Sequence, residues 1–183
     1  MSAETLFQLI GVIGFSMFAL SFQLLKPRHT IFMQAFANLV LAVHFYGLGY
    51  IFPAYVPVIA SLRDFASALA PRKIQLICLG VFVVLLYGGW AYVGAGWTDS
   101  FALIGSTFAA LAQVFRGCFY RYRFCLFAHQ SLWLSVYVSV MSVAGMIFMS
   151  GIWVSNVIGI ARYYFGQKGV SSQEQKSCPV EAE

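Results

Sequence analysis

Apolar segments of about twenty residues follow one another from the start of this 183-residue chain to about Phe165, separated by short polar, glycine-rich or proline-containing breaks. As an α-helix, a segment of this length spans the roughly 30 Å hydrocarbon core of a bilayer. The segments are continuous and do not alternate with period two, which excludes a β-barrel. Only 9% of the residues are charged, against about 25% in a soluble domain. The sequence therefore predicts an all-α, polytopic membrane helix bundle.

The breaks divide the chain into seven predicted transmembrane helices: 6–25, 31–49, 51–69, 74–94, 100–115, 124–143 and 146–165. The last break, at Ala144-Gly145, is the weakest. We expect residues 1–166 to form a single transmembrane domain. The Ser-, Gln- and Glu-rich residues 167–183 are expected to form a disordered cytoplasmic tail.

The positions of the basic residues predict the orientation of the chain. If the N-terminus is outside, every Lys and Arg, from Lys26 and Arg28 onward, lies at or near the inner end of a predicted helix. Glu4 and Asp99 are then the charged residues on the outer side. Because Lys and Arg are retained on the cytoplasmic side, we expect a periplasmic N-terminus and a cytoplasmic C-terminus.

Short segments of the chain recur in the same order, which predicts an internal repeat. The matches are Ile13-Gly14 with Ile104-Gly105, and Val58-Ile59-Ala60-Ser61-Leu62-Arg63 with Val157-Ile158-Gly159-Ile160-Ala161-Arg162. We predict two parallel three-helix repeats, 6–69 and 100–165, joined by a linker helix over 74–94. In this arrangement Arg63 and Arg162 occupy equivalent positions.

Four residues inside the predicted helices are candidates for binding a solute, because an unpaired polar group is costly in lipid. Asn156 lies in the middle of the last helix, and Pro57, at the equivalent repeat position, would free a backbone carbonyl. Gln34 and Asn38 are four residues apart and share one helix face. Structural roles stay open, with an interhelical hydrogen bond for Asn156 and a helix kink for Pro57.

Other polar residues are expected to have structural roles. His44 lies about 120° around the helix from Asn38, which favours a structural histidine over a second cavity residue. Arg63 and Asp64 are expected at the cytoplasmic interface, where both side chains can extend toward water. The run from Phe119 to Arg123 is expected to form an interfacial belt.

No catalytic motif is present, and the histidines and cysteines lack the spacing of metal ligands. We therefore expect no enzyme activity, no metal, no cofactor and no nucleic-acid partner. The four cysteines form no C-x-x-C pair, and we expect all of them to be reduced.

Several of these segments resemble the YgjV-type bacterial inner-membrane proteins. They are Gly11-Val12-Ile13-Gly14-Phe15, the stretch from Gln34 to His44-Phe45, Leu62-Arg63 and Ile160-Ala161-Arg162, and the similarity covers roughly residues 10 to 165. That family is similar to PQ-loop and SWEET-type bundles, so the resemblance implies an inner-membrane location and a small helical bundle. The chain has no Pro-Gln dipeptide, and the PQ-loop hinge is not carried over.

Two functions are compatible with these features. The first is a small transporter of the three-plus-one-plus-three class, which moves an uncharged or weakly polar solute by rocking one repeat against the other. The alternative is a non-transporting membrane protein that binds lipid or a partner subunit. The lipid bilayer is the expected surrounding in both cases, and a homo-oligomer is compatible with either.

Overall fold

The computed structural model describes residues 2–21, 24, 27–69, 71–94, 96–115 and 118–167. They form seven helices: α1 (Ala3–Ser21), α2 (Pro27–Gly47), α3 (Ile51–Leu69), α4 (Arg72–Val93), α5 (Trp97–Val114), α6 (Phe119–Ser139) and α7 (Val143–Gln167). No strand occurs among these residues, and the predicted all-α fold is confirmed. The predicted tail lies outside the described part of the chain, apart from Gln167, which ends α7.

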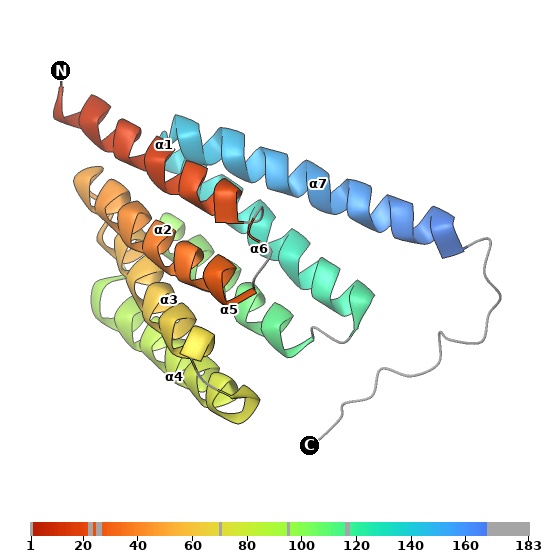
Figure 1. Ribbon diagram of the computed structural model, residues 1–183. Helices are drawn as coiled ribbons and strands as arrows, with labels where there is room; N and C mark the ends of the chain where they lie inside the picture. The colour runs from red at the N-terminus through yellow and green to blue at the C-terminus, as the bar shows by residue number, and fades with distance from the viewer. Residues whose placement is uncertain are drawn as a thin grey trace.

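The helices form one antiparallel bundle (Figure 1). Each helix packs against the next in sequence, α7 returns to contact α1, and α5 contacts α3. Helices α1, α2, α3, α5, α6 and α7 therefore form a closed ring, and α4 packs against α3 and α5. With an odd number of antiparallel helices, the start of α1 and the end of α7 lie at opposite ends of the bundle (Figure 1).

The two ends of the bundle carry opposite charges. The described basic side chains Arg28, Arg63, Lys73, Arg121, Arg123 and Arg162 all lie in the half that contains the end of α7, which we call the basic end. Glu4 and Asp99 lie in the first turns of α1 and α5, at the opposite end, which we call the N-terminal end. This asymmetry is what the sequence predicts for a chain held in a membrane.

The outer surface of the bundle is apolar on every helix. Exposed side chains include Leu9 of α1, Val43 of α2, Leu62 of α3, Val84 of α4, Ile104 of α5, Phe124 of α6 and Ile147 of α7. Four helices, α1, α2, α4 and α7, are each long and apolar enough to cross a membrane. An apolar surface of this extent needs lipid around it, so the fold is a helical membrane bundle.

The helix ends differ from those predicted by up to five residues, and the starts of α6 and α7 show why. The chain turns at Met141, whose φ is 51°, and Ser142 begins α7 by accepting a hydrogen bond at Oγ from the backbone N–H of Gly145 (3.2 Å). A serine at this position satisfies a free N–H group of the first helical turn, so Gly145 lies inside α7 and does not break it. Phe119 begins α6, so the aromatic and basic run ending at Arg123 is helical.

Candidate functional site

A cavity of about 710 Å³ lies inside the bundle and is lined by side chains from all seven helices. Its wall includes Gln75 of α4, Gln113 of α5 and Tyr122 of α6, each within about one turn of the basic end of its helix. In the other direction the lining stops at Phe15 of α1 and Tyr137 of α6. The cavity therefore extends from Tyr137, within one turn of the N-terminal end of the bundle, to the basic end.

All four residues predicted to bind a solute line this cavity. Gln34 and Asn38 reach it from α2, Pro57 from α3 and Asn156 from α7. The predicted common face of Gln34 and Asn38 is therefore the face that α2 turns toward the cavity. The structure brings the four residues together, and their role in solute binding stays a prediction.

Asn156 is only 2% exposed and joins α7 to α6 through its amide. Its Oδ1 accepts a hydrogen bond from Nη1 of Arg123 (3.0 Å). Its Nδ2 donates to the backbone carbonyl of Arg123 (3.3 Å) and to Oε1 of Gln130 (3.3 Å). Asn156 thus makes an interhelical hydrogen bond and also lies beside the cavity. Because both amide hydrogens have acceptors, its main effect is to position Arg123.

Asp64 connects α3 with α2 at the cavity wall. Its Oδ2 accepts a hydrogen bond from Nδ2 of Asn38 (3.1 Å), and its Oδ1 forms an ion pair with Nη2 of Arg63 (2.7 Å). The Arg63 guanidinium also lies 4.8 Å from the ring centroid of Phe82 in α4. Arg63 and Asp64 both line the cavity, so the expectation that they extend outward at the membrane interface is wrong. The cavity gives these charges a polar surrounding inside the bundle.

Arg123 and His129 of α6 are cavity residues that the sequence did not single out as a site. The sequence placed the run containing Arg123 in an interfacial belt, and gave His129 no role beyond lacking the spacing of a metal ligand. In the structure, Nδ1 of His129 donates a hydrogen bond to the backbone carbonyl of Gly105 in α5 (2.9 Å). The sequence does contain a pattern that indicates the cavity face of α6. Arg123, Gln130 and Tyr137 recur at intervals of seven residues and so share one helix face.

Gln34 and Gln113 are the amides most available to a solute. Both line the cavity, and neither has a hydrogen-bond partner among the residues that the structure describes. Pro57 has no N–H group, so the carbonyl of Pro53 lacks its usual helical donor, but Pro53 is fully buried and does not line the cavity. Part of the polar wall is therefore not used by the fold itself.

At the N-terminal end, an aromatic cluster closes the cavity. Tyr137 stacks on Phe45 of α2 with ring centroids 5.6 Å apart, and Phe15 of α1 meets the Tyr137 ring edge to face at 5.4 Å. Phe15 also contacts Phe148 of α7 at 5.1 Å. These rings bring together residues of α1, α2, α6 and α7 near the N-terminal end of the bundle.

Hydrogen bonds hold the N-terminal end together beyond the aromatic cluster. Nδ1 of the fully buried His44 donates to the carbonyl oxygen of Phe7 (2.7 Å), and its Nε2 accepts from the hydroxyl of Ser142 (2.9 Å). Gln8 of α1 donates to the carbonyl of Met141 (2.9 Å). His44 does not line the cavity and has partners at both ring nitrogens, as expected of a structural histidine.

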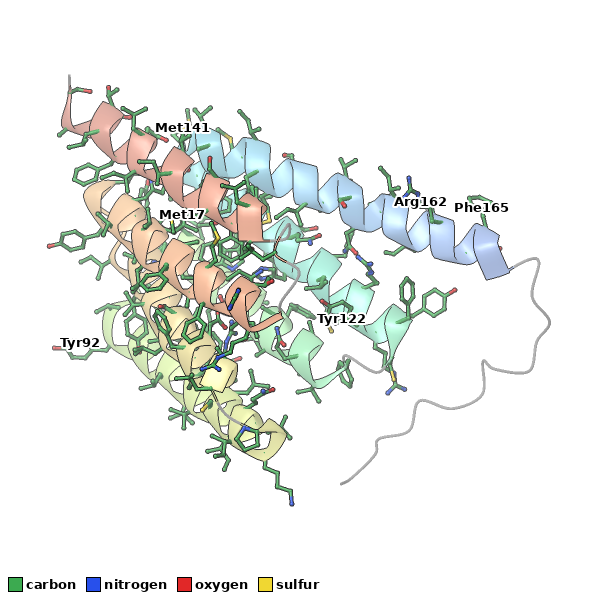
Figure 2. All side chains as sticks on the ribbon, viewed as in Figure 1. Met17, Tyr92, Tyr122, Met141, Arg162 and Phe165 are labelled. Carbon is green, nitrogen blue, oxygen red and sulfur yellow. The ribbon has the colours of Figure 1, made fainter. Side chains whose placement is uncertain are left out.

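Arg162 does not share the surroundings of Arg63. It is exposed and projects from α7 away from the other helices, as does Phe165 (Figure 2). Arg63 lines the cavity, so the two arginines, aligned in the predicted repeat, lie in different environments. The cause is packing: α4 covers α3 beside Arg63, whereas among the described helices α7 contacts α6 and α1 alone.

Cysteine and metal chemistry contribute nothing identifiable to this site. Cys78 and Cys125 are free thiols, whereas Cys118 is disulfide-bonded, so the expectation that all cysteines are reduced is wrong for Cys118. In the described ranges, no three His, Cys, Asp or Glu side chains are grouped to hold a metal ion. The predicted lack of a metal and a cofactor stays a prediction.

Comparison with known proteins agrees with the membrane fold. No curated protein and no solved structure matches the chain. A family model, Imp-YgjV, described as bacterial inner membrane protein, matches residues 5–167, which cover nearly the whole bundle and its cavity. The chain is therefore a multi-pass membrane protein and belongs to the Imp-YgjV family of bacterial inner membrane proteins.

Proposed function

We propose that this protein is a small-solute transporter whose solute enters the cavity from the basic end. The observation that carries this proposal is the cavity of about 710 Å³ inside a membrane bundle, lined by all seven helices. Its volume falls within the roughly 300 to 1,000 Å³ that is common for ligand sites.

The distribution of polar groups supports this proposal. Polar side chains inside a membrane are expected to pair with one another. Gln34 and Gln113 instead face the cavity without a hydrogen-bond partner among the described residues. A bundle with a purely structural role gains nothing from such groups, whereas a transported solute needs donors and acceptors along its path.

The helix contacts are compatible with motion of one half of the bundle against the other. In the predicted repeat, α1 corresponds to α5 and α3 corresponds to α7. The contact between α1 and α7 then corresponds to the contact between α5 and α3, and both contacts are present. This is the relation that two parallel three-helix repeats require. The structure is closed at the N-terminal end by the aromatic cluster and the His44 hydrogen bonds, so outward opening must separate these contacts.

The proposed orientation has the N-terminal end in the periplasm and the basic end in the cytoplasm. A reporter fused after Lys73, in the first turn of α4, is expected to report a cytoplasmic location. A reporter fused near Asp99, at the start of α5, is expected to report a periplasmic one. Alkaline phosphatase and fluorescent protein fusions measure the two locations, and a cytoplasmic signal at Asp99 would contradict the orientation.

Transport itself is tested with the purified protein in liposomes loaded with a mixture of small polar and organic-acid solutes. We expect the protein to release a subset of them, measured by mass spectrometry against protein-free liposomes. If no solute is released and lipid or a partner subunit copurifies in fixed ratio, the non-transporting alternative replaces this proposal.

A further inference from the structure

The charges on the cavity wall do not balance. Its charged residues are Arg63, Asp64 and Arg123. Asp64 is paired with Arg63 at 2.7 Å. Arg123 has no ion-pair partner among the described residues, and the other described acids, Glu4 and Asp99, lie at the N-terminal end. The cavity therefore carries one positive charge that the described residues do not neutralise.

The Arg123 side chain is held in place, but only part of its hydrogen-bonding capacity is used. Nη1 donates to Oδ1 of Asn156, and the guanidinium lies against α7, where a Cβ atom at Gly159 would come within 3.4 Å of it. Its Cζ atom lies 5.4 Å from the ring centroid of Phe119. Nε is buried without a hydrogen-bond partner among the described residues, and Nη2, which is not buried, has no partner among them either.

We infer that the cavity binds a small organic anion, with the guanidinium of Arg123 holding its carboxylate. A guanidinium presents its N–H groups as a planar fork that matches a carboxylate. Nη1 is bonded to Asn156 and Nε is buried, so a carboxylate in the cavity accepts its hydrogen bond from Nη2, which has no partner among the described residues. The sequence alone suggested an uncharged or weakly polar solute, and the charge of the cavity favours an anion instead.

The other side chains of the cavity wall indicate the chemistry of the part of the anion beyond its carboxylate, which we call its body. Aromatic side chains make up much of the surface away from Arg123: Phe15, Phe18, Phe82, Trp133 and Phe148. Such a surface favours an apolar or aromatic body, because its burial removes apolar area from water. This inference rests on the proposed function in treating the cavity as a solute site.

The test compares 2-naphthoate with its uncharged amide, 2-naphthamide, in binding to the full-length protein in a neutral detergent. We expect the wild-type protein to bind 2-naphthoate on the order of tenfold more tightly than 2-naphthamide, by calorimetric titration. Arg123→Gln is expected to remove this preference. The matched control is Arg121→Gln, which removes a charge from the same helix at an exposed position and should leave the preference unchanged.

A second variant guards against misfolding of Arg123→Gln. Asn156→Asp places a carboxylate beside Nη1 of Arg123 and neutralises its charge while keeping the arginine. It is expected to remove the preference for 2-naphthoate. Because its second carboxylate oxygen faces the Arg123 carbonyl and Gln130 in place of the amide donor, we expect a lower melting temperature, and binding is measured below that temperature on the folded protein. The inference is overturned if 2-naphthoate and 2-naphthamide bind the wild-type protein equally, or if folded Asn156→Asp protein keeps the wild-type preference.

Competition experiments distinguish a free organic anion from inorganic phosphate and from a lipid headgroup. Inorganic phosphate, which has no apolar body, is expected to compete weakly with 2-naphthoate. Strong competition by phosphate would overturn the aromatic part of the inference. Competition by phosphatidylglycerol but not phosphatidylcholine in mixed micelles would retain the anion site and assign it to a lipid headgroup. The binding measurements are independent of the liposome release experiment. If the preference for 2-naphthoate depends on Arg123 but no solute is released from liposomes, the anion site is supported and the transporter proposal is rejected.

Discussion

Ala60→Phe is expected to abolish solute release from liposomes. Ala60 lines the cavity on the same face of α3 as Pro57 and Arg63, three residues away on either side. A phenyl ring at this position extends into the open volume and occupies the space through which the solute passes. Because the ring fills empty space, the variant should insert and fold normally. Release is measured with the solute mixture used for the wild-type protein.

The control for this variant lies two residues further along α3. Leu62 is exposed on the outer surface of the bundle and does not line the cavity. Leu62→Phe therefore adds an aromatic ring toward lipid and is expected to leave release unchanged. Equal release by the wild-type protein and by folded Ala60→Phe protein would show that the solute does not pass through this cavity.

Gly145→Ala is expected to lower the free energy of unfolding by about 1–3 kcal/mol, the usual cost of overpacking a core. A Cβ atom at Gly145 would lie only 2.3 Å from the nearest ring carbon of Tyr137. Tyr137 is 4% exposed and stacks on Phe45, so its ring cannot move aside without disturbing the aromatic cluster. Thermal unfolding in detergent measures the effect as a lower melting temperature.

Gly151→Ala provides a control for Gly145→Ala in the same helix. A Cβ atom at Gly151 would meet no atom within 4 Å, and the residue is exposed. Alanine there should leave the melting temperature unchanged or raise it slightly, because alanine favours the helix over glycine. If both variants unfold at the wild-type temperature, the packing of α7 on Tyr137 is not as described.

The seven helices could be predicted because lipid imposes a length on each apolar segment. Their ends could not be predicted closely, because local hydrogen bonds decide them. Ser142 begins α7 by accepting the N–H of Gly145, although a glycine after an alanine looked like the break. Phe119 to Arg123 is polar enough to suggest a loop, yet these residues form the first turn of α6.

The candidate site was predicted where a polar residue interrupts a long apolar segment. Gln34, Asn38 and Asn156 stand out for this reason, and all three line the cavity. Arg63 and Arg123 lie near helix ends, where a long basic side chain can reach either the water at the membrane surface or an internal cavity. The choice depends on neighbouring helices such as α4, which the sequence of one helix does not specify.

The account depends most directly on a water-accessible cavity that opens at the basic end. Ala109 lines this cavity from α5, and Ile104 of the same helix is exposed on the outer surface. In a chain whose native cysteines are replaced by alanine, Ala109→Cys is expected to react with a membrane-impermeant maleimide applied from the cytoplasmic side, while Ile104→Cys does not react. Reaction of Ala109→Cys only from the periplasmic side, or from neither side, would contradict the account.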